Sequence, residues 1–257
     1  EIAADHRRQQ INSAIAIAPG PRLNFGALRF RGRTAVREDR LREIAGYPEG
    51  EVFSPDDLDD VGDRLRRTGV FSSVSLEEAE SANPDDTLDI AARVVDRKPR
   101  RFGFGAELSS SEGIATSGYW LHRNIFGGAE RLRFDAEVSG IGEENGGMDY
   151  FLGTRLTRPA TFHPDASAFV FAELERENEP DYLTEGGRIG AGLSYIFSDT
   201  LTGEAALTLD YTRSWAGFGM QEFFHVSLPV ELTWDRRDDK LDPTPGFYVD
   251  TNVKPYV

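Results

Sequence analysis

The chain is 257 residues long, contains no cysteine and carries a formal net charge of -15 at pH 7. The negative balance argues against nucleic acid as a partner, because nucleic-acid binding needs a basic surface. The lack of cysteine excludes disulfide scaffolds, thiolate metal sites and cysteine nucleophiles, and no apolar run reaches the length of about 18 residues that a transmembrane helix requires.

Residues 1–21 contain one predicted strand, Ile11–Ala18, which ends at Pro19-Gly20-Pro21. The flanking sequence offers this strand no hairpin partner. We therefore interpret residues 1–21 as the end of a module that precedes residue 22.

Residues 22–99 are predicted to form one compact α/β module. Ser54 and Pro55 favour the start of a helix, and Gly46 favours the end of one. The predicted elements are strand Leu23–Phe30, helix Arg37–Ala45, a helix with the apolar stripe Leu58, Val61 and Leu65, strand Val70–Glu77 and strand Leu88–Val95. The order of the module is therefore β-α-α-β-β.

From about Arg100 onward, segments of roughly ten residues alternate apolar and polar side chains and are separated by turn-forming residues. The clearest alternation lies in Phe223–Asp235, where every second residue is apolar. Successive side chains of a strand point to opposite faces, so each such strand has one apolar and one polar face. The predicted strands are Phe102–Ser110, Thr116–Asn124, Glu130–Gly140, Met148–Arg158, Ala166–Glu177, Gly187–Phe197, Leu201–Arg213, Glu222–Asp235 and Phe247–Val257. This series predicts that residues 100–257 belong to an outer-membrane β-barrel.

For one predicted strand, the sequence does not show which face is apolar and which is polar. In Ala166–Glu177, the apolar side chains of Phe169 and Phe171 share a parity with Glu173 and Glu175.

No pattern in the sequence indicates catalysis or ligand chemistry. The four histidines, His6, His122, His163 and His225, do not have the spacing of a metal-binding motif. We expect no enzymatic activity, no metal site and no cofactor.

Two sets of residues resemble known families. The first lies in and just before the α/β module, which resembles a POTRA (polypeptide-transport-associated) domain. The matching residues are Gly20 and Pro21 before the first strand, Gly32 after it, and Thr68, Gly69 and Phe71 in the closing stretch Leu65–Val74. In this closing stretch the glycine ends the helix and the phenylalanine enters the core.

The second set resembles the family of outer-membrane assembly barrels that includes BamA and TamA. Gly103–Glu107 matches the first barrel strand, and Arg123–Glu130 matches a recurrent turn. A mid-barrel turn is matched by Asp235, Arg237, Asp238, Pro243 and Gly246, while Pro245 departs from the usual pattern.

The resemblance implies an α+β POTRA module followed by the N-terminal half of an antiparallel transmembrane barrel, about nine of sixteen strands. The stretch Gly20-Pro21-Arg22 favours TamA over BamA. The family's later V-R-G-[FY] motif is missing, so we interpret the chain as a fragment truncated at both ends.

The function implied is the insertion or translocation of outer-membrane proteins such as autotransporters, with the POTRA module in the periplasm. The first barrel strand would form a lateral gate and pair with a substrate or partner strand through Phe102, Gly103, Phe104, Gly105, Ala106, Glu107 and Leu108. Its glycines fit either a weakly held edge or the relief of barrel curvature. Expected partners are outer-membrane lipids, nascent outer-membrane proteins and a TamB-like partner that is anchored in the inner membrane and spans the periplasm.

Two alternatives remain from the sequence. One is a two-partner-secretion pore that exports a dedicated protein. The other is a soluble β-rich binding or enzyme domain, whose apolar faces would be buried between two sheets.

Overall fold

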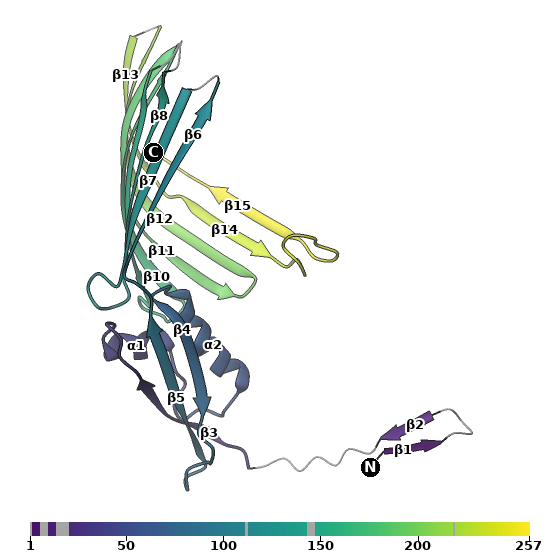
Figure 1. Ribbon diagram of the computed structural model, residues 1–257. Helices are drawn as coiled ribbons and strands as arrows, with labels where there is room; N and C mark the ends of the chain where they lie inside the picture. Colours follow the sequence, from purple (N-terminus) through teal and green to yellow (C-terminus); the bar gives the residue numbers. More distant parts are fainter. Residues whose placement is uncertain (1, 6–9, 14–20, 111–112, 143–146, 218) are drawn as a thin grey trace.

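The computed structural model describes residues 2–5, 10–13, 21–110, 113–142, 147–217 and 219–257, which form a short hairpin, an α/β module and a large curved sheet (Figure 1). In the hairpin, β1 (Ile2–Asp5) pairs antiparallel with β2 (Gln10–Ser13). The expectation that the strand Ile11–Ala18 has no partner nearby is therefore wrong. Residues 14–18 of that predicted strand, and Gly20, lie outside the described residues.

The α/β module has the predicted order β-α-α-β-β. Its elements are β3 (Asn24–Arg31), α1 (Glu38–Ala45), α2 (Pro55–Arg67), β4 (Phe71–Glu78) and β5 (Thr87–Asp96). The Ser54 hydroxyl accepts a hydrogen bond from the Asp57 N–H at 3.3 Å, which caps α2. Gly46 ends α1 with φ at +55°, a conformation that glycine adopts without strain. The central strand β5 runs parallel to β3 and antiparallel to β4.

The core of the module lies between its sheet and its two helices. The most deeply buried large side chains are Phe25, Leu41, Ile44, Val61, Leu65 and Ile90. The ring of Phe25 lies 5.2 Å from that of Tyr47 and 5.0 Å from that of Phe53. Ala129 and Ala160, from two connections of the large sheet, belong to the same core. The module therefore packs directly against connections of the sheet.

The large sheet is antiparallel throughout and follows the order of the sequence. Its strands are β6 (Arg100–Ser109), β7 (Gly113–Arg123), β8 (Arg131–Ile141), β9 (Asp149–Pro159), β10 (Ala166–Glu179), β11 (Tyr182–Ser198), β12 (Leu201–Ala216), β13 (Gly219–Ser227), β14 (Val230–Asp235) and β15 (Tyr248–Val253). Neither helix in the described part of the chain is long and apolar enough to cross a membrane.

The predicted strand Glu222–Asp235 is divided into β13 and β14, which both pair with β12. The division falls at Pro229, which has no N–H to donate to the ladder. Its carbonyl still accepts from the Ala206 N–H at 3.0 Å. The register is unchanged across the break, because Ser227 faces Thr208 and Val230 faces Ala205. The predicted alternation of faces therefore holds along the whole stretch.

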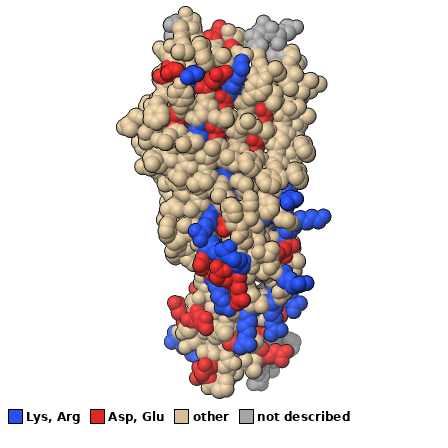
Figure 2. Space-filling model, turned by 90° about the vertical axis from the view of Figure 1, so that its left-hand side faces the viewer, with Lys and Arg blue, Asp and Glu red and all other residues tan. Residues whose placement is uncertain are grey.

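The two faces of the sheet differ in polarity. Figure 2 looks at the convex face and shows a band with few charged residues over the middle of the strands, between charged residues near the top of the sheet and a larger number over the junction and the module below. Exposed side chains of this face include Phe104, Leu152, Leu174, Ile189 and Leu207. The concave face instead carries ion pairs such as Arg155–Glu204 at 2.8 Å and Arg188–Asp210 at 2.6 Å. This division is typical of a barrel wall with a lipid side and a polar lumen.

The glycines of β11 explain why two phenylalanines of β10 lie on the concave face. Phe169 faces Gly192 and Phe171 faces Gly190. A Cβ atom at Gly192 would lie 2.5 Å from the Phe169 ring, and one at Gly190 would lie 2.6 Å from the Phe171 ring. Both rings therefore lie on the concave face, over glycines, beside the charged residues of that face.

Candidate functional site

The predicted gate strand is the edge strand β6 of the large sheet. It pairs with β7 in an unbroken register from Arg100–His122 to Ser109–Gly113. No described residue pairs with the other edge of β6. All seven residues predicted for strand pairing, Phe102 to Leu108, lie within this strand. Main-chain donors and acceptors along such an edge form a template for another strand.

The convex side of β6 is apolar and open. Phe102, Phe104 and Leu108 are 61%, 89% and 81% exposed. Beside them lies a depression of about 540 Å³, with Trp120 and Phe134 among its walls. The rings of Trp120 and Phe134 stack at 5.6 Å between β7 and β8. An incoming strand would meet apolar side chains on this side.

The concave side of β6 explains one of its two glycines. A Cβ atom at Gly103 would lie 2.1 Å from the ring of Tyr119, its cross-strand neighbour. Gly103 therefore gives room to Tyr119, a reason that the sequence did not reveal. At Gly105, a Cβ atom would lie 2.7 Å from the Ser117 hydroxyl.

The strand is joined closely to the α/β module. Only residues 97–99 separate β5 from β6. The Arg123 N–H donates to the Pro99 carbonyl at 2.7 Å, and the Arg123 guanidinium donates to the Lys98 carbonyl at 3.2 Å. The short link is therefore fixed to the end of β7.

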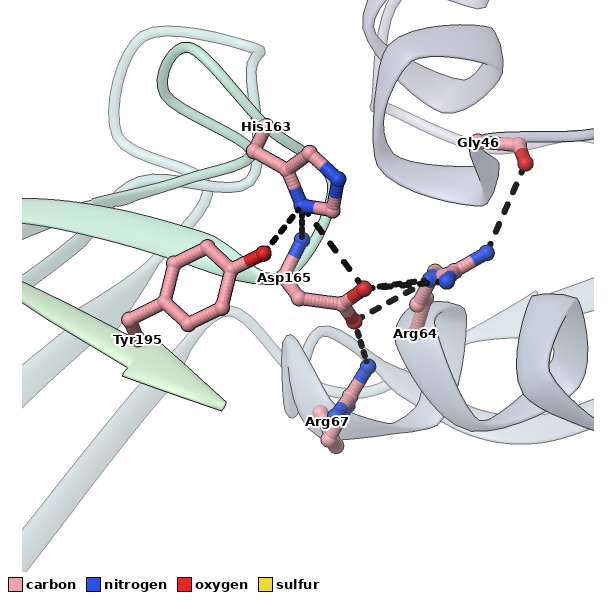
Figure 3. Close-up of polar contacts among 6 residues, drawn as sticks. All are labelled: Gly46, Arg64, Arg67, His163, Asp165 and Tyr195. Atoms are coloured by element: carbon pink, nitrogen blue, oxygen red, sulfur yellow. Dashed lines mark hydrogen bonds and ion pairs between the residues drawn. The ribbon is translucent and has the colours of Figure 1, made fainter. Parts of the chain in front are cut away.

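The module also binds the connection between β9 and β10 through Asp165 (Figure 3). The Asp165 carboxylate lies 2.9 Å from Nη2 of Arg64 and 2.6 Å from Nη2 of Arg67, both on α2. Arg64 also donates to the carbonyl of Gly46 at 3.4 Å. On the other side, His163 Nδ1 accepts from the Asp165 N–H at 3.2 Å and lies 3.4 Å from the Tyr195 hydroxyl.

The electrostatics of this contact favour the charged pair. Burial alone would raise the pKa of the Asp165 carboxyl, but the hydrogen bonds and charges of Arg64 and Arg67 hold it below its usual value. For Arg64 the effect of burial has the opposite sign, because burial alone would lower the pKa of its guanidinium. The hydrogen bond and the charge of Asp165 outweigh burial, so the pKa of Arg64 is raised. Asp165 therefore remains ionised at neutral pH.

Further contacts hold the connection between β7 and β8 and the end of β9. Gly127 accepts from the Arg37 N–H at 2.9 Å, and Phe126 accepts from the Arg37 guanidinium at 2.8 Å. Arg40, which is 2% exposed, donates to the Pro159 carbonyl at 2.6 Å and pairs with Glu43. Sequence reasoning identified the Arg123–Glu130 turn but not these contacts.

The POTRA motif residues have structural roles in the module. The Thr68 hydroxyl donates to the Leu65 carbonyl at 2.7 Å and accepts from the Val70 N–H at 3.3 Å. Gly69 has a φ of +69° and Gly32 a φ of +103°, which lie in the region that favours glycine. Phe71 is 4% exposed and belongs to the core, whereas Pro21 is exposed.

The mid-barrel turn between β14 and β15 is closed by its own side chains. Asp235 accepts from Nε and Nη2 of Arg237, both at 2.9 Å. Asp238 accepts from the Thr244 N–H at 3.0 Å and the Thr244 hydroxyl at 2.6 Å, and these hydrogen bonds lower its pKa. Gly246 has a φ of +118°, and a Cβ there would lie 2.2 Å from the Arg236 carbonyl oxygen. Pro243 lies exposed in the same turn.

Within the described part of the chain, no group of three or more His, Asp or Glu side chains could hold a metal ion. The main feature of the site is an edge strand with an apolar and a polar side, whose first residue adjoins the short link to the α/β module.

Comparison with known proteins identifies both parts. The family model described as POTRA, "Surface antigen variable number repeat", matches residues 23–96, and the Omp85 superfamily domain matches residues 124–257. A BamA structure from Haemophilus ducreyi lacking POTRA domains 1–3 is similar over the whole chain, with 15% identity and a TM-score of 0.70. CdiB from Acinetobacter baumannii is similar over 91% of the chain, with 9% identity and a TM-score of 0.64. The chain covers 52% of that BamA chain and 46% of that CdiB chain, so it spans about half their length.

Proposed function

The chain belongs to the Omp85 superfamily, and from this membership we propose that it forms part of an outer-membrane barrel subunit that inserts or translocates outer-membrane proteins. In this proposal the sheet crosses the outer membrane and the POTRA module lies in the periplasm. The expected substrates are nascent outer-membrane proteins, autotransporters among them. A TamA-like role with a TamB-like partner that spans the periplasm stays a prediction.

The observation that carries the proposal is the edge strand β6. Its convex side is apolar, its concave side is polar, and its second edge has no partner in the described residues. A strand that adds to this edge gains main-chain hydrogen bonds without a strict demand on its sequence. It also continues the apolar face of the sheet, which suits a strand entering a lipid bilayer.

The POTRA module offers a second edge for strand addition. The outer edge of β3 is partly covered, because Phe25 exchanges hydrogen bonds at 2.8 Å with Glu51 and Gly50. The edge of β4 has no strand partner other than β5 in the described residues. We expect β4 to be the edge of the module that receives a passing polypeptide.

A transport pore for one dedicated protein is the second candidate. The charged residues of the concave face, such as Arg155, Glu204, Arg188 and Asp210, would suit the wall of an aqueous channel. A pore would pass its substrate along this face and would not need β6 to pair with it.

Cysteine cross-linking separates the two candidates, because the chain has no cysteine of its own. The Phe104→Cys variant of the full-length protein is expressed with a substrate that carries a cysteine in its final strand. Leu152→Cys is the matched control, since Leu152 is an exposed residue of the same face on the interior strand β9. Disulfide adducts at Phe104→Cys alone are the expected result. Equal adducts at both positions, or none, would contradict a lateral gate at β6.

A further inference from the structure

The depression on the convex face, of about 540 Å³, has a floor of small residues and walls of large ones. Gly118 of β7 faces Ala136 of β8, and these two residues form the floor. In the same row across the strands lie Phe104 of β6 and Leu152 of β9, whose side chains are exposed. A Cβ atom at Gly118 would lie 3.4 Å from the Phe104 ring. The missing side chain of Gly118 therefore keeps the depression open beside β6.

The dimensions of the depression suit a single long apolar chain. Its volume lies within the range of about 300–1,000 Å³ that is usual for small-molecule sites. It crosses the sheet from Phe104 on β6 to Leu174 on β10, which is four strand spacings or roughly 19 Å. One leaflet of a bilayer contains roughly 15 Å of hydrocarbon. The stacked rings of Trp120 and Phe134 line the side of the depression that is nearer to the module.

Two exposed arginines lie on the convex face between the depression and the module. Arg100 precedes Phe102 by two residues on β6, so both project from the same face. Arg158 follows Thr154 by four residues on β9 and shares its face in the same way. Neither arginine forms an ion pair with the residues that the structure describes. An apolar depression therefore adjoins cationic groups that have no acidic partner.

We propose that the depression is a site for one phospholipid of the leaflet on the module side. An acyl chain lies over Gly118 and Ala136, and the phosphate is bound by Arg100 and Arg158. Arginine suits this ligand, because its guanidinium donates two parallel hydrogen bonds to a phosphate. A phospholipid combines the long apolar chain and the anionic group that the two parts of the site require. This inference rests on the proposed function, which places the convex face in the membrane and the module in the periplasm.

The bound lipid contacts the proposed gate strand as well as its neighbours. Phe102 and Phe104 of β6 line the same depression as Trp120 of β7 and Phe134 of β8. An acyl chain in the depression covers apolar surface from all three strands, and burial of this surface is favourable. The lipid therefore favours the arrangement in which β6 lies against β7.

The test measures lipid binding to the full-length protein, delipidated in detergent, by native mass spectrometry. The ligand is dioleoylphosphatidylglycerol, and the matched ligand is dioleoylglycerol, which has the same acyl chains and no phosphate. We expect one molecule of the phospholipid to bind saturably. It should bind about tenfold more tightly than dioleoylglycerol, the effect of a charge-assisted hydrogen bond.

A variant that fills the floor assigns the acyl chain to the depression. Ala136→Leu adds three carbon atoms where the chain would lie and should weaken binding of the phospholipid about tenfold. Ala191→Leu is the matched control, because Ala191 is an exposed residue of the same face on β11, outside the depression. This control should bind like the wild type. Heat-modifiable migration on gels checks that each variant has a folded barrel.

Arginine variants assign the phosphate. The double variant Arg100→Gln/Arg158→Gln should bind the phospholipid with the affinity that the wild type has for dioleoylglycerol. The control double variant Arg31→Gln/Arg33→Gln removes two exposed arginines of the module and should keep the preference for the phospholipid.

The possible outcomes separate this inference from the proposed function. Equal binding to the wild type and to Ala136→Leu, or a preference for the phospholipid that survives in Arg100→Gln/Arg158→Gln, overturns the lipid site and leaves the proposed function intact. If Ala136→Leu instead abolishes binding of a second copy of the protein, the depression is a contact between copies and the inference is wrong. Recovery of the full-length protein from the soluble fraction and not from outer membranes contradicts the proposed function, and the inference with it.

Discussion

Asp165, in the connection between β9 and β10, is bound by Arg64 of α2 across 101 positions of sequence. The two side chains are 14% and 17% exposed, so water screens their interaction only in part. Together with Arg67, they attach the POTRA module to a turn of the barrel sheet.

We expect Asp165→Asn to weaken this attachment. The substitution removes the negative charge but keeps the size of the side chain, and it leaves Arg64 and Arg67 without their shared ion-pair partner. The free energy of unfolding of the module should fall by about 1–3 kcal/mol, measured by urea denaturation. Asp181→Asn, an exposed position at the turn between β10 and β11, is the control and should change little. An equal effect of both variants would contradict the role of Asp165.

The same contact should depend on pH at the acidic end. Because the pKa of Asp165 is lower in the folded protein than its usual 3.8, its stabilisation is present above that value and is lost as the pH falls through the folded pKa. Hydrogen exchange of the Thr161 and Ala166 amides, corrected for intrinsic rates, should therefore lose protection below about pH 4. Asp165→Asn should remove this pH dependence, and its persistence in the variant would assign it to another group.

Gly103→Ala should strain β6, the proposed gate strand. The added Cβ would lie 2.1 Å from the Tyr119 ring, so the ring must move or the strand must shift. Overpacking of this kind costs about 1–3 kcal/mol, which should appear as a lower Tm of heat-modifiable migration. The double variant Gly103→Ala/Tyr119→Ser should recover most of the loss. Gly217→Ala is the matched control, because nothing lies within 4 Å of that Cβ position.

Phe71→Ala tests the closing motif of the POTRA module. Phe71 is 4% exposed, and its removal should lower the free energy of unfolding of the module by about 3–5 kcal/mol. Val95→Ala on β5, a position that is 50% exposed, should cost far less. Urea denaturation, monitored by a spectroscopic signal from the module, measures the free energy of unfolding of both variants. Similar losses for the two variants would show that Phe71 is not a core residue.

Local chemistry explains why much of this fold could be predicted. The order β-α-α-β-β follows from signals such as Ser54 before α2 and Gly46 after α1, which act within one helical turn. The strands of the sheet follow from alternation, and even across Pro229 the predicted faces are correct.

The remaining features depend on contacts between distant parts of the chain. The faces of β10 are decided by Gly190 and Gly192 of β11, which leave space for Phe169 and Phe171. The attachment of the module depends on Asp165, which in sequence is an ordinary acidic residue in a turn. Periodicity describes one strand at a time, so it cannot identify either relationship.

Ala129 and Ala160 have a mechanical consequence. Because these two residues of the sheet's connections belong to the core of the module, the boundary near residue 99 separates two patterns of sequence that share one packed core. We expect a pull on the module in the periplasm to act as a torque on the ends of β6 to β10. The module would then transmit this torque to β6, the proposed gate strand.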